Sequence, residues 1–502
     1  MADHSRRQGH RKPDVENIDK IAGFKGSTRC GMQIKDLLTE YDESIEANAY
    51  RDPMGLQIIW SAVGQNIFGR NLTSISNDLR NFNINLFNHW IVKDLSEGDH
   101  SIQLNRKTKA IDSEIALKTG LIIFLENLLI YIFVESGKDS RGLLGTQKAR
   151  NMLSAAKRQA NPKPVIISVH VSEHEILTRQ ISLGVNGRYR TPFIEAGLMD
   201  KYYNYAPYGS AWKEVDLLFQ GNSYGALAGM VKELVQKLFE DPQNDKIPQI
   251  ELNTVFSDKE ITDLYLSCFD EKMRAMKDRF LGFWRKRLKL EGGTTAGVLY
   301  ESVQRVIGQN RETDLNTKSE PVIKQVIDEA LRDPELTDEH GSRIDDIKKL
   351  EPFLVSINFL FKMICAKDIK IVEDLQIALD RIKDMAGEPI DILLRLKVQA
   401  ETASAVCKKI SGDSSERLQQ LVGIDFSNLT QCIQGIQKYH GLVMERRGNN
   451  AWFSFDGMNI KHNVREYTTE SIRLAEWENS YYIYSLISLC RGMEDLNREA
   501  SE

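Results

Sequence analysis

The most apolar stretch of the chain runs from Ile115 to Val134 and reads IALKTGLIIFLENLLIYIFV. From Gly120 onward it would span ~22 Å as a helix, less than the ~30 Å core of a bilayer. The pattern predicts a buried helix at the centre of the N-terminal half, with a polar seam through Thr119, Glu126 and Asn127. The alternative is a membrane span, in which Glu126 would need a polar partner within the lipid.

Two helices with apolar residues at spacings of three and four precede this stretch, at residues 52–68 and 73–95. On another face of the second helix, amide and hydroxyl side chains recur within about 80° of one another. Asn is a mediocre helix former, so such a row is either a solvated face or an amide ladder against a partner helix or ligand. The row consists of Ser74, Asn77, Asn81, Asn85 and Asn88.

One of few predicted β-strands, VIISVHV at residues 165–171, follows the proline-rich boundary 161–164. A capping box of Ser172 and Glu175 then predicts a helix that begins at Ser172. His170, Glu173 and His174 have the H-x-x-E-H order of inverted zinc metalloproteases, whose two histidines share one helix face. Because the cap places His170 outside the helix, we expect local hydrogen bonds here and no metal site.

Two loops in the middle of the chain also combine residue types found at binding sites. The turn GVNGRYR at residues 184–190 has glycines like those of a phosphate cradle, but no G-K-[ST] and no preceding G-x-G-x-x-G on a strand, so we read it as a loop or helix start. The segment KYYNYAPYGSAW at residues 201–212 is aromatic. We expect its rings to pin the loop onto the domain, and a stacking surface is the alternative.

A basic stretch occupies the end of a helix predicted to begin at Ser257 and to run as far as Leu290. Residues 271–290 contain eight Lys and Arg against two acidic residues, and Phe280, Phe283 and Trp284 are interleaved with them. This combination predicts contact with nucleic acid or an acidic partner, although cations also favour a helix C-terminus through its dipole. The candidate contact residues are Arg279, Arg285, Lys286, Arg287 and Lys289.

The C-terminal ninety residues predict a small supersecondary unit. A helix that a capping box opens at Asp413, a four-residue turn and a helix over residues 427–439 precede three short β-runs, at 442–446, 451–455 and 458–462. Helix, turn, helix and hairpin is the layout of a winged helix, whose second helix presents side chains of the kind that bond base edges. The candidate contact residues of this unit are Gln431, Gln434, Lys438, Arg446 and Arg447.

Composition limits the environment and the partners. The net charge of −5 excludes a polycation that coats nucleic acid or an anionic membrane, so any such contact is local. The six cysteines show no CxxC spacing, which is typical of reduced thiols in a cytosolic protein. The N-terminus is basic but lacks the apolar segment of a secretory signal.

The expected fold is mostly α and multidomain, with helical bundles and a winged-helix-like β-hairpin module near the C-terminus. We predict a disordered basic tail (1–30), an N-terminal helical domain (31–160), a middle α domain with one short strand and a long basic helix (161–307), a polar linker (308–352), a helical segment (353–410) and the C-terminal module (411–502).

Function is predicted mainly by elimination. Nucleophile-elbow, kinase, Walker, Rossmann and paired-carboxylate motifs are all missing from the sequence. In layout alone, the chain resembles components of bacterial mobile-element and phage-defence systems. We expect a non-catalytic cytosolic component of a larger assembly that contacts a protein partner, a second copy of itself or nucleic acid, with no membrane contact, cofactor or metal. The alternative is a metal-dependent hydrolase that uses His170, Glu173 and His174.

Overall fold

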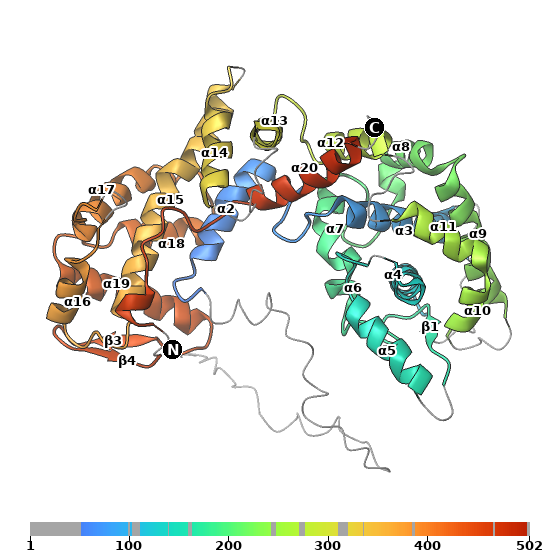
Figure 1. Cartoon of the computed structure of the whole chain (residues 1–502), viewed down its shortest axis with the longest axis horizontal. Coiled ribbons are helices and arrows are strands. Elements are labelled where there is room, and N and C mark those ends of the chain that lie inside the picture. Colours follow the sequence, from blue (N-terminus) through green and yellow to red (C-terminus); the bar gives the residue numbers. More distant parts are fainter. Residues whose placement is uncertain are drawn as a thin grey trace, which may run out of the picture. The chain divides into compact units, whose positions relative to one another are not determined.

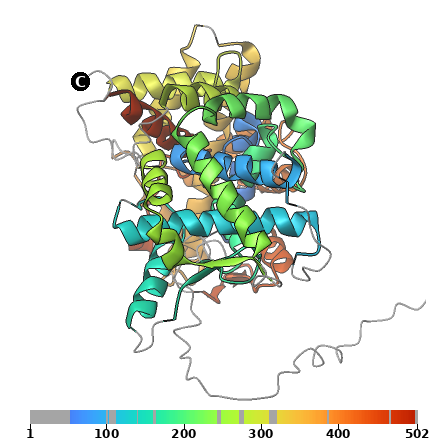
Figure 2. The same cartoon turned by 90° about the vertical axis from the view of Figure 1, so that its right-hand side faces the viewer.

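In the computed structural model of the chain, helix α4 (Glu114–Ser136) is buried on all sides, because every residue from Leu117 to Phe133 is buried. The predicted buried helix is therefore confirmed. Within the part of the chain that the structure describes, α4 is also the one helix long and apolar enough to cross a membrane, but 94% of its most apolar window lies inside the protein. It is seen end-on in Figure 1 and from the side in Figure 2, and it contacts α3 (Leu79–Glu97), α5 (Thr146–Arg158), β1 (Ile166–Ser168), α6 (Gln180–Leu183) and α11 (Lys259–Cys268).

The structure describes residues 52–98, 101–102, 111–138, 140–158, 163–241, 247–270, 277–309, 320–334, 336–383, 387–464 and 467–498. The predicted basic tail at residues 1–30 lies outside these ranges. Residues from Pro53 onward form one compact unit, so the predicted division of this part into several domains stays a prediction.

Helix α3 begins at Leu79 and not at Thr73, because Asp78 caps it. The Asp78 carboxylate accepts the Arg80 N–H at 2.8 Å, while the hydroxyls of Thr73 and Ser76 hydrogen-bond to each other at 2.8 Å in the preceding turn. Helix α2 (Leu56–Phe68) lies before this turn, as the apolar spacing predicts.

The amide row of α3 is not a solvated face. Asn81, Asn85 and Asn88 are all buried, and Asn85 and Asn88 have no accessible surface. Among the described residues, none of the four side-chain amide atoms of Asn85 and Asn88 has a hydrogen-bond partner. A buried amide without a partner in the protein loses its hydrogen bonds to bulk water, which opposes folding.

The predicted strand is shorter than expected, and the helix predicted from Ser172 is wrong. β1 pairs antiparallel with β2 (Gln249–Glu251), with Ile167 opposite Ile250. Residues 169–179 then form bends, and His174 has a φ of 61°, which is incompatible with a helix there. The following elements are α7 (Val185–Glu195), η3 (Ala206–Tyr208), α8 (Gly209–Phe219), α9 (Ser223–Glu240) and α10 (Leu252–Ser257).

The long basic helix predicted from Ser257 to Leu290 is also wrong. α10 ends at Ser257, and α11 begins after Asp258, whose side chain accepts the Ile261 N–H at 3.2 Å. α11 ends at Cys268, and the basic residues from Lys277 to Arg287 belong to a separate helix, α12 (Lys277–Arg287). The capping carboxylate of Asp258 therefore begins a new helix inside the stretch that appeared continuous.

Much of the expected polar linker is helical. α13 (Thr295–Gln309) and α14 (Glu320–Leu331) lead to α15 (Asp338–Ile364), so residues 338–352 are the first half of a 27-residue helix. Ile344, Ile347 and Leu350 are buried within it, and this burial stabilises a segment whose composition is polar. α16 (Val372–Leu379) and α17 (Ile392–Ser404) follow, and α17 packs along α15 (Figure 1).

In the C-terminal part, α18 (Asp413–Val422) and α19 (Leu429–Arg446) confirm the predicted helix pair. The strand predicted at 442–446 is wrong, because α19 continues through Gly441 and buries Val443 and Met444. β3 (Phe453–Phe455) and β4 (Ile460–His462) form the predicted antiparallel hairpin, and α20 (Ile483–Arg498) ends the described chain. The mostly α class is thus confirmed, with the described strands confined to two two-stranded sheets.

Candidate interaction surface

Helices α18 and α19 approach each other closely at a glycine. A Cβ atom on Gly435, in the middle of α19, would lie 2.7 Å from Cγ2 of Ile424 in the turn after α18. Because Cβ atoms do not come that close, only glycine lets Ile424 pack directly against the α19 backbone. Asn428 caps α19 by accepting the Gln431 N–H at 2.9 Å. The tight turn and this cap fix the two helices at the edges of a groove.

The groove has a volume of about 510 Å³ and is lined by both helices and their turn. Three predicted contact residues line it from α19, where spacings of three and four residues place them on one face. These are Gln431, Gln434 and Lys438, and Gln419 and Gln420 of α18 also line the groove.

Apolar surface accompanies these polar groups. Ile424 also lines the groove, together with Leu442, whose side chain is 40% exposed. An exposed leucine in the next turn of the helix after Lys438 gives the groove a hydrophobic contact point among hydrogen-bonding side chains. This mixture of apolar and polar groups is typical of protein interfaces.

The groove has no net charge, since Lys438 is balanced by Asp425. Hydrogen bonds from Ser427, through its backbone N–H and its side chain, lower the pKa of Asp425, so this carboxylate is ionised at neutral pH. Within the described residues, the side chains of Gln431, Gln434 and Lys438 make no hydrogen bond or ion pair. They are therefore available to a ligand.

Arg446 and Arg447 lie at the end of α19 and have structural roles. Arg446 forms an ion pair with Asp413 at the start of α18, and Glu416 lies 4.0 Å away. Burial opposes ionisation of Asp413, but the hydrogen bonds and charges of Arg417 and Arg446 lower its pKa. Arg447 is the C-cap residue of α19. Neither arginine lines the groove.

The hairpin after α19 is bonded along one edge to another segment of the chain. The Ile460 N–H donates to Lys370 O at 2.7 Å, and the Val372 N–H donates to Met458 O at 3.2 Å. At the other end, the Trp452 N–H donates to Nε2 of His440 at 2.9 Å, so the second ring nitrogen of this histidine donates to Pro53 O at 3.0 Å. The helix pair and the hairpin therefore occur in the predicted order, but the hairpin is hydrogen-bonded through its backbone to residues 370–372.

The basic stretch of α12 has its aromatic side chains in the core. Phe280, Phe283 and Trp284 are buried, and Trp284 donates its indole N–H to Asn83 at 2.6 Å. These rings are therefore unavailable for stacking on bases. Lys272 and Arg274 lie outside the described residues.

The cations of α12 differ in exposure. Lys286 and Arg287 both bind Glu214, at 2.9 and 2.7 Å, and Arg285 lies over the ring of Tyr300. Burial opposes ionisation of Glu214, but hydrogen bonds from Lys286 and Arg287 lower its pKa. Arg279 and Lys286 of α12 are exposed, as is Lys289 in the turn after it, whereas Arg285 and Arg287 are half-buried.

The residues of the H-x-x-E-H motif do not lie on a common helix. His170 Nδ1 accepts the Ser172 N–H at 3.2 Å, and His174 Nδ1 lies 3.2 Å from the hydroxyl of Ser168. The Glu173 carbonyl accepts from the same hydroxyl at 2.9 Å. Among the described residues, no group of three His, Cys, Asp or Glu is placed to hold a metal ion.

The polar seam of α4 binds the segment around α6 and α7. Glu126 accepts the Asn186 N–H at 2.7 Å and the Gln180 side-chain N–H at 3.1 Å, and Asn127 accepts from the same Gln180 nitrogen at 2.8 Å. A Cβ on Gly184 would lie 2.3 Å from the Glu126 carboxylate, so glycine is needed there. Burial raises the pKa of Glu126 to about 7, against the opposing effect of these hydrogen bonds.

His89 of α3 belongs to the same buried region. Asn186 donates its side-chain N–H groups to Tyr203 and to Ile181 O, so its oxygen accepts from His89 Nε2 at 3.0 Å. The other ring nitrogen then accepts the Tyr205 hydroxyl at 2.8 Å, which makes His89 a neutral imidazole. Burial lowers its pKa to about 4.

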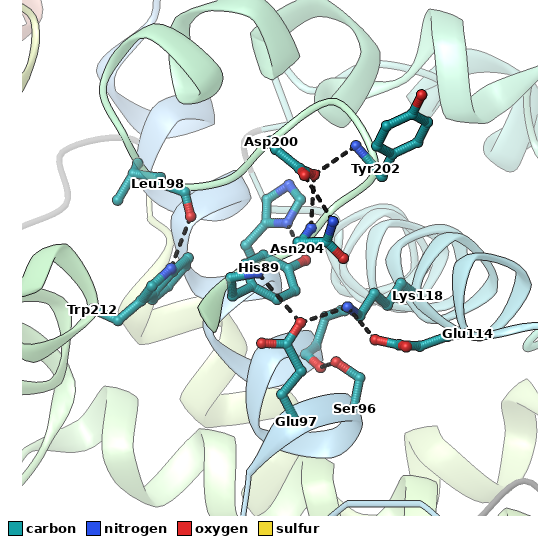
Figure 3. Close-up of polar contacts among 12 residues, drawn as sticks. His89, Ser96, Glu97, Glu114, Lys118, Leu198, Asp200, Tyr202, Asn204 and Trp212 are labelled. Atoms are coloured by element: carbon teal, nitrogen blue, oxygen red, sulfur yellow. Dashed lines mark hydrogen bonds and ion pairs between the residues drawn. The ribbon is translucent and has the colours of Figure 1, made fainter. Parts of the chain in front are cut away.

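The aromatic loop at residues 201–212 is pinned by its rings, as predicted. Tyr203, Tyr205 and Trp212 are buried, and Trp212 donates to Leu198 O at 2.8 Å. Figure 3 shows this contact, together with Asp200, which accepts from the Tyr202 and Asn204 N–H groups. It also shows the neighbouring ion pairs of Lys118 with Glu97 and Glu114.

Comparison with protein-family models, with curated proteins and with solved structures gives no match to this chain. The residues that sequence reasoning missed are Gln419, Gln420, Ile424 and Leu442. Gly435 was the available signal, because a glycine inside a predicted helix indicates a close contact with a neighbouring element.

Proposed function

We propose that this protein is a non-catalytic cytosolic component of a larger assembly and binds a protein partner in the groove between α18 and α19. In this proposal, residues 411–502 act as a winged-helix-like docking module. The proposal rests on one observation: the three contact residues predicted on one face of α19 line a groove that also contains an exposed leucine.

The charge of the groove favours protein over nucleic acid. A nucleic-acid site neutralises phosphates with several Lys and Arg, whereas this groove has one cation and one anion. The cations of α12 offer a more basic surface, but their aromatic neighbours are buried and Glu214 binds two of them. Protein is therefore the first choice, and nucleic acid is an outcome that the experiments below distinguish.

The lining residues define the partner's chemistry. We expect an uncharged segment that places one apolar side chain against Leu442 and Ile424. Its backbone N–H and C=O groups would bond the glutamine amides on both edges, since each amide offers a donor and an acceptor. An apolar anchor surrounded by polar contacts is the usual arrangement of a small docking site.

Site-specific photocrosslinking tests this proposal. A benzophenone amino acid replaces Gln434, which lines the groove, and in a control protein it replaces Leu217 of α8, which is 75% exposed on a different helix. In a lysate of the native host, we expect one protein to crosslink from position 434 and not from position 217. Introducing Leu442→Glu into the crosslinking protein should remove that product, because the charge would be buried in the apolar contact.

Three results would contradict the proposal. These are equal crosslinking from both positions, no protein product from position 434, or a product at position 434 that survives Leu442→Glu. A crosslink to nucleic acid alone from position 434 would overturn the choice of partner. Circular dichroism of each variant shows that loss of crosslinking does not reflect unfolding.

A further inference from the structure

A second cleft, of about 370 Å³, lies among α14, α15, α17 and the segment before α20. None of its residues belongs to the α18–α19 groove or to α12, so it is separate from the proposed docking site. Its lining consists of Lys324, Pro352, Lys383, Ile390, Arg395, Leu474, Ala475 and Glu476.

The cleft gathers positive charge in an acidic protein. Lys324, Lys383 and Arg395 line it, and Glu476 is the one carboxylate in its lining. Lys324 pairs with Glu476 at 3.4 Å. Among the described residues, Lys383 and Arg395 have no ion-pair partner. Within the described part of the chain, two cations therefore face the same cleft without a counterion.

Arg395 is held in place by a network of hydrogen bonds. With its amide nitrogen toward α15, Gln399 donates to the Ser356 hydroxyl at 2.8 Å and to Pro352 O at 3.1 Å. In that orientation its oxygen accepts the Arg395 Nε–H at 3.1 Å. The remaining guanidinium N–H groups have no hydrogen-bond partner among the residues that the structure describes, so they can bind a ligand. The fixed side chain also loses less rotamer entropy when it binds one.

Lys383 is positioned by its backbone. It forms a β-bridge with Pro389, and the Ile390 N–H donates to Ile382 O at 3.0 Å. These bonds close the base of the loop and place Lys383 beside Ile390. Half-buried Pro352, Ile390 and Leu474 then supply apolar surface next to the two cations.

We propose that this cleft binds a small organic anion, with a carboxylate or phosphate group on Arg395 and Lys383 and an apolar body against Pro352, Ile390 and Leu474. A guanidinium binds two oxygens of either group at once, and an ammonium adds a third charged hydrogen bond. The volume lies within the range of small-molecule sites.

A titration with phenyl phosphate and phenylacetate, followed by ligand-observed NMR at low salt, tests this proposal on the full chain. We expect saturable binding of at least one of the two compounds. The compound that binds more tightly shows whether the site prefers a phosphate or a carboxylate group. Arg395→Gln should weaken binding by about tenfold or more, and Lys383→Gln should weaken it less, because charged hydrogen bonds are lost. Lys397→Gln is the matched control, since Lys397 is exposed on the same helix and does not line the cleft.

Inorganic phosphate and phenol test the charged part and the apolar part of the site separately. We expect both to bind more weakly than phenyl phosphate, because each lacks one half of the contacts. The proposal is overturned if neither aromatic anion saturates, if Lys397→Gln weakens binding as much as Arg395→Gln, or if phenol binds as well as the anions. Circular dichroism of each variant checks its fold.

Discussion

Glu126 of α4 accepts the backbone N–H of Asn186 at 2.7 Å, so a carboxylate from one buried helix caps the first turn of another. The N-cap residue of α7, Gly184, has no side chain for this purpose, and a larger residue there would collide with Glu126. The polar seam of the central helix therefore holds α4 and α7 together through hydrogen bonds.

The buried Glu126 carboxyl that caps α7 predicts that the stability of the protein depends on pH. The pKa of Glu126 is raised from 4.5 to about 7 in the folded protein. The contribution of this shift to the free energy of unfolding is therefore complete below pH 4.5 and is lost as the pH rises through 7. The stability of the wild type relative to Glu126→Gln should therefore fall by roughly 3 kcal/mol between pH 4.5 and pH 8. Urea denaturation of both proteins at several pH values measures this difference.

Because His89 is present in both proteins, its opposite contribution, which is lost as the pH falls from 6.5 through about 4, cancels in the comparison. A stability difference that does not change with pH would show that Glu126 titrates in the folded state as it does in the unfolded chain.

The buried amides of α3 predict two different responses to the same substitution. Asn88 has no partner among the described residues, so Asn88→Ala should change the free energy of unfolding by less than about 1 kcal/mol. Asn83→Ala should destabilise by about 1–3 kcal/mol, because the buried indole N–H of Trp284 would lose its acceptor. Chemical denaturation of the two variants measures both values, and equal losses would contradict this assignment.

The contact of Gly435 with Ile424 predicts energetic coupling. Gly435→Ala gains about 1 kcal/mol of helix propensity but forces Ile424 to move, so we expect a net loss of about 1 kcal/mol. Ile424→Ala should cost about 2–4 kcal/mol by leaving a cavity, and the double variant should be more stable than the sum by about 2 kcal/mol, because the truncated side chain no longer collides with the Cβ atom added at position 435. A double-mutant cycle by urea denaturation tests this, and strict additivity would refute the close contact.

The basic residues of α12 and Lys289 just after it predict weak binding of nucleic acid. We expect fluorescence anisotropy with labelled duplex DNA and single-stranded RNA to show no binding at about 150 mM salt, and binding at about 50 mM salt that disappears when the exposed Arg279, Lys286 and Lys289 are changed to Glu. Arg287 is left unchanged because its guanidinium also donates a hydrogen bond to Ala196 O. Tight binding at the higher salt would favour a nucleic-acid function.

Local sequence patterns predicted helices and strands better than they predicted tertiary contacts. The apolar run of α4 and the polar positions Glu126 and Asn127 are visible in the sequence, but Gln180 and Asn186 lie more than fifty residues away and no local rule identifies them. The amide row of α3 is likewise periodic, yet period alone does not distinguish a solvated face from a buried one.

Where tertiary packing opposed local propensity, the prediction failed. The sequence predicted a helix that ends at residue 439 and a β-run at 442–446, but burial of Val443 and Met444 continues the helix. Similarly, residues 338–352 read as a linker because polar residues dominate, whereas three buried aliphatic residues are enough to hold that half of α15 in the core. The residues that α19 contributes to the proposed groove were predictable from one face of this helix. The residues of α18 and the turn after it were not, because their place beside α19 depends on the tertiary structure.

The most direct test of the proposed docking site is the dissociation constant of the partner identified by crosslinking, measured by calorimetry with wild type, Leu442→Glu and the control Leu217→Glu. Both leucines are exposed, at 40% and 75%, but only Leu442 lines the groove. We predict that Leu442→Glu weakens binding by about a hundredfold and that Leu217→Glu leaves it unchanged. Equal affinity of all three proteins would contradict docking in the groove between α18 and α19.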